Sequence, residues 1–400
     1  MLAVAFLGAL VGAAAAAGVQ VLGVQRAAQP PGPPAPVQVG LWVRQESLVD
    51  PEGLRAAVGL ARQLGVQDLY VQVLSRGEAA YRSAIWPMPA LPRMPADPLA
   101  EVLALARRAG LRVHGWLLVY PWGRLDAPPT DPRHPLVRHP EWVTVDREGR
   151  SLWRYRVGEH PEVNGLFVDP GLEGVRRVVV ETVQELARRY DLDGIHLDYV
   201  RYPGPHLGYH PAALQRFWQA SGLEHPPAAG SPSASVALPV TPEEVRAWQA
   251  FREQQVSTLV REVASALREE GLALALSAAV MPELRRARES YAQNWLAWLQ
   301  AGWVSSVALM SYTTDPSQLG TWVRSAVASA GGRAGIRAGI GVYRLPSGRP
   351  EELVNLVRTA WQAGASGIVL FSFESLEGRP ALQQAARAAI TGLGGAAPGR

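Results

Sequence analysis

The strongest constraint on the fold is a repeated alternation of two kinds of segment. From Val37 onward, short apolar runs rich in β-forming residues alternate with amphipathic stretches of helical period. Eight such runs occur, at residues 37–43, 68–74, 111–120, 194–202, 272–280, 305–312, 338–343 and 367–373. The helical stretches include residues 51–65, 97–110, 174–190 and 351–364, and several of them are followed by glycine, a normal helix stop.

This alternation predicts an α/β protein. Near-continuous apolar strands are typical of a parallel sheet that helices cover on both faces. Eight strand–helix units predict a (β/α)8 TIM barrel, with long loops after the third and fourth strands. An open, doubly wound sheet is the alternative, but no glycine-rich phosphate-binding turn follows the first strand.

The first 36 residues differ from the rest of the chain. Residues 1–24 are apolar apart from Gln20, which predicts a signal peptide within residues 1–25 or an uncleaved membrane anchor. A buried N-terminal helix is the remaining alternative. Residues 26–36 contain "QPPGPPAP" and read as an extended proline-rich linker. We therefore expect an exported protein, periplasmic, envelope-associated or secreted, with its barrel at residues 37–392 and a disordered tail at 393–400.

Composition excludes several kinds of chemistry. All 39 basic residues are arginine, so a Schiff-base lysine and a phosphate-loop lysine are both excluded. The chain has no cysteine, which excludes disulfides, thiolate nucleophiles and cysteine–zinc sites. The net charge of +4 comes without a long basic run, which argues against nucleic-acid binding and suits an acidic glycan or an anionic cell surface. The sequence does not indicate an oligomeric state.

Two connections are long, and both leave the carboxyl ends of predicted strands. They cover residues 121–168 and 204–245. Active sites of (β/α)8 barrels lie at that end, so these loops predict a substrate cleft. The second loop includes a flexible insertion at about residues 204–240, and a functionless insertion fits that segment equally well.

The segment "DLDGIHLDYVRYPG" places several polar groups in an apolar strand. Alternation along the strand predicts that His196, Asp198 and Val200 point into the barrel. A buried carboxylate is costly unless it is hydrogen-bonded or has a function, and glycosidases place one beside the positive charge of their transition state. Asp198 is therefore the first catalytic candidate, expected as the nucleophile or as the stabiliser of the reacting centre. Arg201 could pair with a carboxylate or bind an anionic substrate group, and His196 could equally be a satisfied interior histidine.

Several ordered pieces of the chain resemble the bacterial glycosyl hydrolase-like family 10 over about residues 38–378. They are "GEAAYRSAIWP", "DPLAEVLALARRAGLRVHGWL", "HPEWVTVDREGR", "FVDPGLEGVRR", "DLDGIHLDYVRYP", "VALMSY" and "GIVLFSFESL". The resemblance implies a (β/α)8 barrel. It also implies an activity like that of the family's cell-envelope enzymes, which act on peptidoglycan glycan strands. Two departures stand out: Tyr199 takes the place of a second adjacent acid, and "VYPWG" takes the place of an Asn-Pro pair after strand 3.

A more distant likeness is to family 18 chitinases. On their strand 4 pattern, Val200 falls where the catalytic glutamate would be, so chitinase-type catalysis is not supported. The segment "LMSY", which ends at Tyr312, resembles the strand 6 segment in which a tyrosine contacts the sugar.

Glycoside hydrolysis usually needs a second carboxylate. The candidates just past strand ends are Glu374, Asp315 and Glu46, with little to choose between them, and helix capping is an equal alternative for Asp315. The N-acetyl group of an amino sugar could instead supply the nucleophile, and the sequence does not choose between these mechanisms.

Aromatic residues near strand ends suit stacking on sugar rings, although each could equally belong to the core. Together with His196 and Arg201, the substrate-binding candidates are Tyr120, Trp122, Tyr202, Tyr312 and Tyr343. His134, His139 and His160 look scattered and no HExxH occurs, so we expect no metal and no cofactor.

These patterns favour an exported glycoside hydrolase that acts on a bacterial envelope or extracellular polysaccharide, with peptidoglycan glycan strands as one candidate. The alternative is a non-catalytic glycan-binding or scaffolding barrel at the cell envelope, which the missing second acid at Tyr199 would suit. A barrel lyase or deacetylase is a third, weaker hypothesis.

Overall fold

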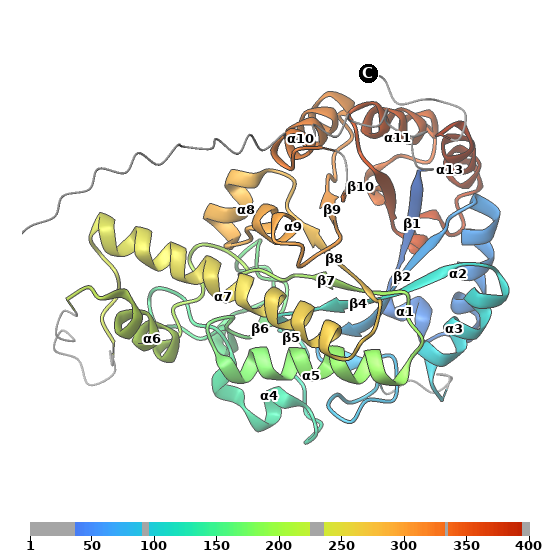
Figure 1. Ribbon diagram of the computed structural model, residues 1–400. Coiled ribbons are helices and arrows are strands. Elements are labelled where there is room, and N and C mark those ends of the chain that lie inside the picture. The colour runs from blue at the N-terminus through green and yellow to red at the C-terminus, as the bar shows by residue number, and fades with distance from the viewer. Residues whose placement is uncertain (1–36, 90–95, 225–235, 333–334, 394–400) are drawn as a thin grey trace, which may run out of the picture. The chain divides into compact units, whose positions relative to one another are not determined.

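A closed barrel of eight parallel strands forms the centre of the protein (Figure 1). The structure, a computed structural model, describes residues 37–89, 96–224, 236–332 and 335–393. Strand β1 pairs with both β2 and β11, which closes the sheet. In order around the barrel, the strands are β1 (Gln38–Val43), β2 (Asp68–Ser75), β4 (Arg112–Leu118), β7 (Gly194–Asp198), β8 (Ala275–Val280), β9 (Ser306–Met310), β10 (Ile336–Gly341) and β11 (Gly367–Phe371).

Helices follow the strands and surround them (Figure 1). The main ones are α2 (Pro51–Leu64), α3 (Pro98–Arg108), α5 (Glu173–Arg189), α7 (Pro242–Glu269), α9 (Trp295–Gln300), α10 (Pro316–Ser329), α11 (Glu351–Gln362) and α13 (Pro380–Leu393). In α2 and α3, Asp50 and Asp97 cap the first turn and a proline follows each. No helix of the described residues has the length and apolar character needed to cross a membrane.

Shorter elements lie in the connections. They are α1 (Gln45–Leu48), β3 (Glu78–Ala79), β5 (Pro121–Gly123), α4 (Pro135–Arg138), β6 (Leu166–Phe167), α6 (Pro211–Ser221), α8 (Leu284–Tyr291), α12 (Phe373–Leu376) and the 3-10 turns η1 (Pro140–Trp142), η2 (Leu152–Arg154) and η3 (Val342–Arg344). β3 pairs antiparallel with the end of β2, and β5 pairs with β6.

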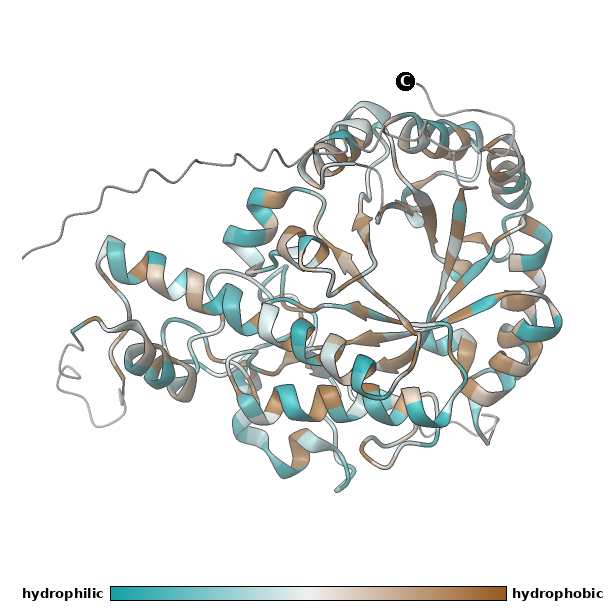
Figure 2. Cartoon of the chain, viewed as in Figure 1, coloured by the Kyte–Doolittle hydropathy of each residue, from teal (hydrophilic) through white to brown (hydrophobic). Residues whose placement is uncertain are grey.

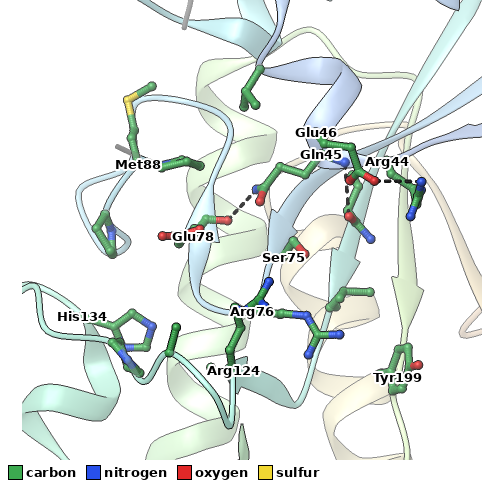
Figure 3. Close-up of a pocket in the computed structure, with 18 of the residues that line it drawn as sticks. Arg44, Gln45, Glu46, Ser75, Arg76, Glu78, Met88, Arg124, His134 and Tyr199 are labelled. Atoms are coloured by element: carbon green, nitrogen blue, oxygen red, sulfur yellow. Dashed lines mark hydrogen bonds and ion pairs between the residues drawn. The ribbon is translucent and has the colours of Figure 1, made fainter. Parts of the chain in front are cut away.

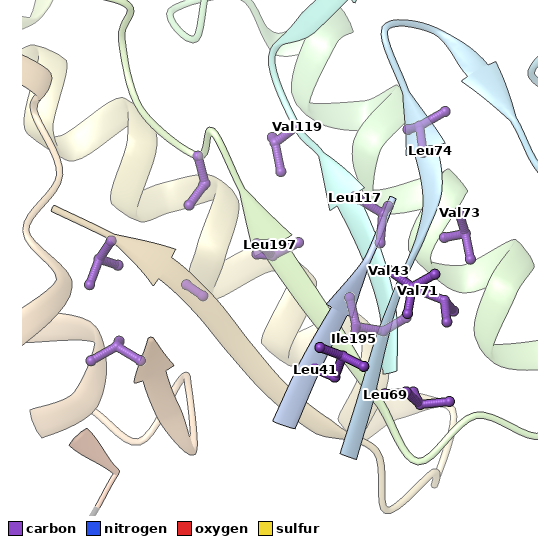
Figure 4. Packing of buried hydrophobic residues seen from close by; sticks show 14 of the residues in the cluster. Leu41, Val43, Leu69, Val71, Val73, Leu74, Leu117, Val119, Ile195 and Leu197 are labelled. Atoms are coloured by element: carbon purple, nitrogen blue, oxygen red, sulfur yellow. The ribbon is translucent and has the colours of Figure 1, made fainter. Parts of the chain in front are cut away.

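Alternation along each strand separates two apolar regions. Leu41, Leu69, Leu117 and Ile195 point outward and pack beneath the helices, as Figure 4 shows. The opposite face fills the barrel with a smaller cluster made of Trp42, Tyr70, Trp116, Leu118, Ala279, Ala308 and Val369. Figure 2 shows the same division as brown strands ringed by helices that carry both brown and teal residues. The barrel is therefore a packed core and not a pore.

A buried polar network occupies the end of the barrel at which the strands begin. The Asp68 carboxylate accepts hydrogen bonds from Arg112 Nε at 2.6 Å and Arg337 Nη1 at 3.0 Å, and its Oδ1 lies 3.2 Å from His114 Nε2. Burial alone would raise the pKa of Asp68, but these hydrogen bonds and positive charges outweigh it and hold that pKa well below its usual range.

The predicted (β/α)8 fold is confirmed, and so are the helices expected near residues 51–65, 97–110, 174–190 and 351–364. Several strands differ from their predicted extent; for example, β4 ends at Leu118 instead of residue 120, and β8 begins at Ala275 instead of residue 272. Strand β10 begins at Ile336, before the predicted run, and β7 ends at Asp198 instead of continuing to residue 202. The chain leaves β7 because Tyr199 adopts a left-handed backbone conformation with φ +50°. Val200 therefore packs in the core outside the barrel.

Part of the predicted flexible insertion at 204–240 is a helix. Helix α6 packs through Leu214, Phe217 and Trp218 against Trp248 and Phe251 of α7. Residues 225–235, the predicted signal or anchor segment at 1–25, the linker at 26–36 and the tail from 394 lie outside the described residues.

Candidate active site

A cavity of about 1050 Å³ opens at the carboxyl ends of the strands (Figure 3). Its walls come from the segments that follow β1, β2 and β4, and its floor includes side chains of the barrel interior. The long loop after β4 contributes residues 123–134, whereas none of the lining residues belongs to the loop at 204–245. The polar and aromatic residues of the lining include Arg44, Gln45, Glu46, Gln72, Arg76, Glu78, Trp116, Arg124, Asp131, His134, Asp198, Tyr199, Tyr312 and Phe371.

Asp198 ends strand β7 and lies in this lining with only 7% of its surface exposed. Its Oδ1 accepts the backbone N–H of Tyr199 at 2.7 Å, and its Oδ2 accepts Trp116 Nε1 at 3.1 Å. Burial raises the pKa of Asp198 to about 6, against the opposing effects of these hydrogen bonds and of the Arg201 charge. The carboxyl group can therefore hold or release a proton near neutral pH.

His196 lies two residues before Asp198 on β7, and it does not belong to the lining of the cavity. Its Nδ1 is 2.9 Å from Ser277 Oγ, and its ring contacts Trp42 and Tyr70. Complete burial holds the pKa of His196 well below its usual range, so the ring is neutral. His196 is thus an interior histidine, but it is only half satisfied, because its buried Nε2 has no hydrogen-bond partner within the described residues.

The three other predicted carboxylates occupy different environments. Glu46 lines the cavity, is exposed, and pairs with Arg44 at 2.9 Å. Glu374 lies behind the lining on α12, where four donors surround its carboxylate. Asp315 is exposed at the start of α10, where its side chain accepts the backbone N–H of Ser317 at 2.8 Å. The structure thus brings Glu46 and Asp198 to one cavity.

The predicted aromatic residues divide between the cavity and the core. Tyr312 lines the cavity and stacks on Phe371 with ring centroids 5.3 Å apart, and the half-exposed Tyr343 packs edge-on against both rings. Tyr120, Trp122 and Tyr202 are fully buried and lie outside the lining.

Arg201 is also outside the lining of the cavity. Its guanidinium group lies over the rings of Tyr199 and Tyr291, at 4.6 Å and 4.8 Å from their centroids, and its Nη1 donates to the carbonyl of Tyr202. This position puts its charge close enough to lower the pKa of Asp198, although less than burial raises it.

Sequence reasoning missed several residues of the lining. Glu78 sits on β3, and burial raises its pKa. Arg76, beside it, has φ +49° and donates through Nη1 to the carbonyl of Asn164. Glu78 stands in "GEAAYRSAIWP", a segment read only for its family resemblance, and Arg76 immediately precedes that segment. Their place directly after an apolar strand was the signal that could have identified them.

One group of three side chains within the described ranges could hold a metal ion, namely His160, Glu162 and His206. It lies outside the lining of the cavity. The sequence reasoning did not connect these residues, because His206 is far from the other two along the chain.

Known proteins share the sequence and the fold. The model of the glycosyl hydrolase-like 10 family matches residues 39–347. Glycosyl hydrolase YngK of Bacillus subtilis (strain 168) is 25% identical over 150 residues, which are 36% of this chain and 26% of that protein. Glycosyl hydrolase DigH of Escherichia coli (strain K12) is 24% identical over 184 residues, 41% of this chain and 37% of that protein. The matches thus span well under half the length of both relatives.

Solved structures with the same fold include two from carbohydrate-active proteins. The glycoside hydrolase domain of PgaB (BpsB) from Bordetella bronchiseptica superposes with a TM-score of 0.67 at 17% identity, covering 89% of this chain and 99% of that one. The catalytic domain of β-amylase from Paenibacillus polymyxa gives 0.63 at 11% identity, covering 90% and 100%. At these identities, the likeness shows the fold alone.

Proposed function

Because the chain belongs to the glycosyl hydrolase-like 10 family, we propose that it hydrolyses glycosidic bonds of a polysaccharide and that Asp198 is its proton donor. One observation carries this proposal: a buried carboxyl group with a pKa of about 6 lies at the end of a barrel strand, in a large cavity. A glycosidic oxygen is a poor leaving group until it is protonated, and a carboxyl group whose pKa lies near the working pH protonates it efficiently.

Glu46 is the proposed partner of Asp198. Strand β1, which Glu46 follows, lies three strands from β7 around the barrel, by way of β2 and β4, so the two carboxyl groups come from nearly opposite sides of the mouth. Glu46 is exposed and paired with Arg44, as suits a charged base or nucleophile. Glu78 follows β2, closer to β7, and its raised pKa suits a group that holds a proton.

Three arginines line the cavity beside four carboxylic residues, and one of the three, Arg76, offers a charge to an acidic polymer. Arg44 pairs with Glu46 and Glu374, and Arg124 pairs with Asp126. Arg76 forms no ion pair with a carboxylate in the part of the chain that the structure describes, and burial lowers its pKa. A carboxylate on the substrate would supply the missing partner at Arg76. Polysaccharides of the bacterial envelope carry such groups, and peptidoglycan glycan strands are the first to test.

Export is part of the proposal. It rests on the apolar composition of residues 1–24 and on the proline-rich segment that follows them. Cell fractionation and N-terminal sequencing of the mature protein test it directly. A protein found in the cytoplasm with Met1 retained would contradict it.

The decisive experiment compares the full wild-type chain with Asp198→Asn. Each is incubated with purified peptidoglycan, with and without stem peptides, and with chitin-type oligosaccharides, and soluble fragments are followed by mass spectrometry. We expect fragments from the wild type and a rate about 10²- to 10⁴-fold lower for Asp198→Asn, which is the usual contribution of a general acid. The wild-type rate should fall as the pH rises through about 6, since Asp198 then loses its proton.

Asp315→Asn is the matched control, because Asp315 is an exposed helix cap outside the cavity. It should keep the wild-type rate. Full activity in a folded Asp198→Asn variant would remove Asp198 from the chemistry. If the wild type instead bound the polymer and released no fragments, the protein would be a non-catalytic glycan-binding barrel.

A further inference from the structure

Two histidines and a glutamate converge at a place that the proposed chemistry does not use. His160 and Glu162 belong to the loop between η2 and β6, and His206 belongs to the loop after β7. Their candidate ligand atoms all lie within 4.8 Å of one another. The two imidazole rings stack with centroids 3.8 Å apart.

The surroundings are shaped for this convergence. A Cβ atom at Gly204 would lie 2.3 Å from Glu162 Oε2 and 3.1 Å from the His206 ring, so only glycine leaves room for both groups. His206 Nε2 is buried and has no hydrogen-bond partner within the described residues. A buried nitrogen without a partner is costly, and a metal ion would satisfy it.

The glutamate also has support from behind. Tyr291 Oη donates to Glu162 Oε1 at 3.1 Å, and Arg286 Nη2 donates in turn to Tyr291 Oη at 3.3 Å. Metal-binding carboxylates are typically oriented by such outer hydrogen bonds. Apart from its stacking on His206, the ring of His160 makes one long hydrogen bond within the described residues, in which its Nδ1 accepts the backbone N–H of Glu162 at 3.4 Å. Little would therefore be lost if the ring turned toward an ion.

We propose that His160, Glu162 and His206 bind one zinc ion, whose fourth position is taken by water. Two imidazoles and one carboxylate are a normal three-ligand set for zinc. In a tetrahedral site with bonds of about 2.1 Å, neighbouring ligand atoms lie about 3.4 Å apart. Because the three ligand atoms now lie within 4.8 Å of one another, the loops need to close by at most roughly 1.4 Å.

The ion would fasten two loops that lie behind the lining of the cavity and contact it through Asn164. Asn164, two residues after Glu162, donates from Nδ2 to Tyr199 Oη at 2.7 Å, and its carbonyl accepts from Arg76. Both Tyr199 and Arg76 line the cavity. Zinc would thus hold the Asn164 contacts in place, acting on the substrate site through position and not through chemistry.

Calorimetric titration of the full chain with zinc chloride, after removal of metal by a chelator, tests the proposal. We expect one zinc ion per chain and a rise in the thermal unfolding midpoint, because a ligand that binds only the folded state stabilises it. Affinity should fall more than about 100-fold in Glu162→Gln and His206→Ala, since even the loss of outer partners costs roughly 10- to 100-fold.

His139→Ala is the matched control, because His139 is an exposed histidine that pairs with Glu141 and lies outside the group of three. It should bind zinc like the wild type. Circular dichroism of the metal-free variants and of the metal-free wild type first checks that each variant is folded. Should His206→Ala fail to fold, Glu162→Gln and His160→Gln carry the test. Absence of stoichiometric binding to the wild type, or binding that survives these substitutions, would overturn the zinc site.

Discussion

Asp198 is held in a state that favours chemistry at a cost to stability. Burial raises its pKa to about 6, although Tyr199 and Trp116 both donate hydrogen bonds to its carboxylate. Two donors are too few to replace the water that a charged carboxylate loses in a packed barrel. The same burial that would suit Asp198 to the proposed role of proton donor therefore makes its charged form costly.

The pH dependence of stability should reveal this cost. Between about pH 4 and pH 6, the folded protein binds a proton at Asp198 that the unfolded chain has released, so the free energy of unfolding falls as the pH rises through this window. A pKa raised by about two units corresponds to roughly 3 kcal/mol. Urea unfolding should show that the free energy of unfolding falls between pH 4 and pH 7 by about this much more in the wild type than in Asp198→Asn. If the free energy of unfolding changed with pH in the same way in both proteins, the raised pKa of Asp198 would be contradicted.

Asp198 could be found from the sequence because a carboxylate in an apolar strand is an anomaly with a physical cost. Glu78 and Arg76 could not be found in the same way. They lie in a turn and a two-residue strand, where charged residues are ordinary, so their place directly after an apolar strand is a weak signal until the fold shows that they face a cavity. Likewise, the strand pattern does not distinguish Tyr312, in the lining, from Tyr202, fully buried; only the resemblance carried by "LMSY" singled out Tyr312.

At the scale of elements, Glu374 joins the ends of the first and last strands of the barrel. Its Oε1 accepts the backbone N–H of Arg44 and the hydroxyl of Ser47, both at 2.8 Å, in the segment after β1. Its Oε2 accepts Arg44 Nε at 3.2 Å and the Ser372 hydroxyl at 2.6 Å. Four donors leave little capacity for a substrate, so this geometry favours a positioning role for Glu374.

Removing the Glu374 carboxylate should reduce the free energy of unfolding more than it reduces turnover. Glu374→Ala leaves a backbone N–H and two hydroxyls without their acceptor, at an expected cost of about 2–3 kcal/mol in the free energy of unfolding. Because Arg44 lines the cavity, KM should rise while kcat falls less than about tenfold. Chemical denaturation and steady-state kinetics check both, and Glu377→Ala, at an exposed neighbour, should change neither. A drop in kcat of a hundredfold or more in the folded variant would restore Glu374 as a catalytic residue.

The sequence predicted the positions of the barrel strands more accurately than the residues at which the strands end. The apolar runs locate all eight barrel strands, since parallel strands buried on both faces require such runs. The end of β7 depends on the Asp198 side chain accepting the backbone N–H of Tyr199, which accompanies the turn out of the sheet. Alternation alone cannot detect such a side-chain bond, and so it extended the strand to residue 202.

For the whole molecule, the proposed site and a buried charge network lie at opposite ends of the barrel. The cavity opens where the strands end, whereas the Asp68 network closes the barrel where they begin. The depressed pKa of Asp68 means that its contribution to stability is present above about pH 4 and is lost as the pH falls further, toward the lowered pKa. This end of the barrel is expected to serve stability alone.

Asp68→Asn should therefore destabilise the protein without altering its site. Loss of the buried charge leaves Arg112 and Arg337 without their shared partner, at an expected cost of about 3 kcal/mol at pH 7. The difference from the wild type should shrink in urea unfolding below about pH 4. Activity per folded molecule should be unchanged, and Asp191→Asn, at an exposed aspartate, should have little effect. An equal loss of activity and stability would show that the two ends are coupled.

A second, smaller hollow shares lining residues with the cavity. Arg76 and Arg124 also line this hollow of about 360 Å³, beside His160 and Asn164. Two hollows that share lining residues offer room for several consecutive units of a polymer. We therefore expect cleavage at internal bonds: the viscosity of a long glycan should drop early, well before much reducing sugar has accumulated, and its products should be oligomers of mixed length.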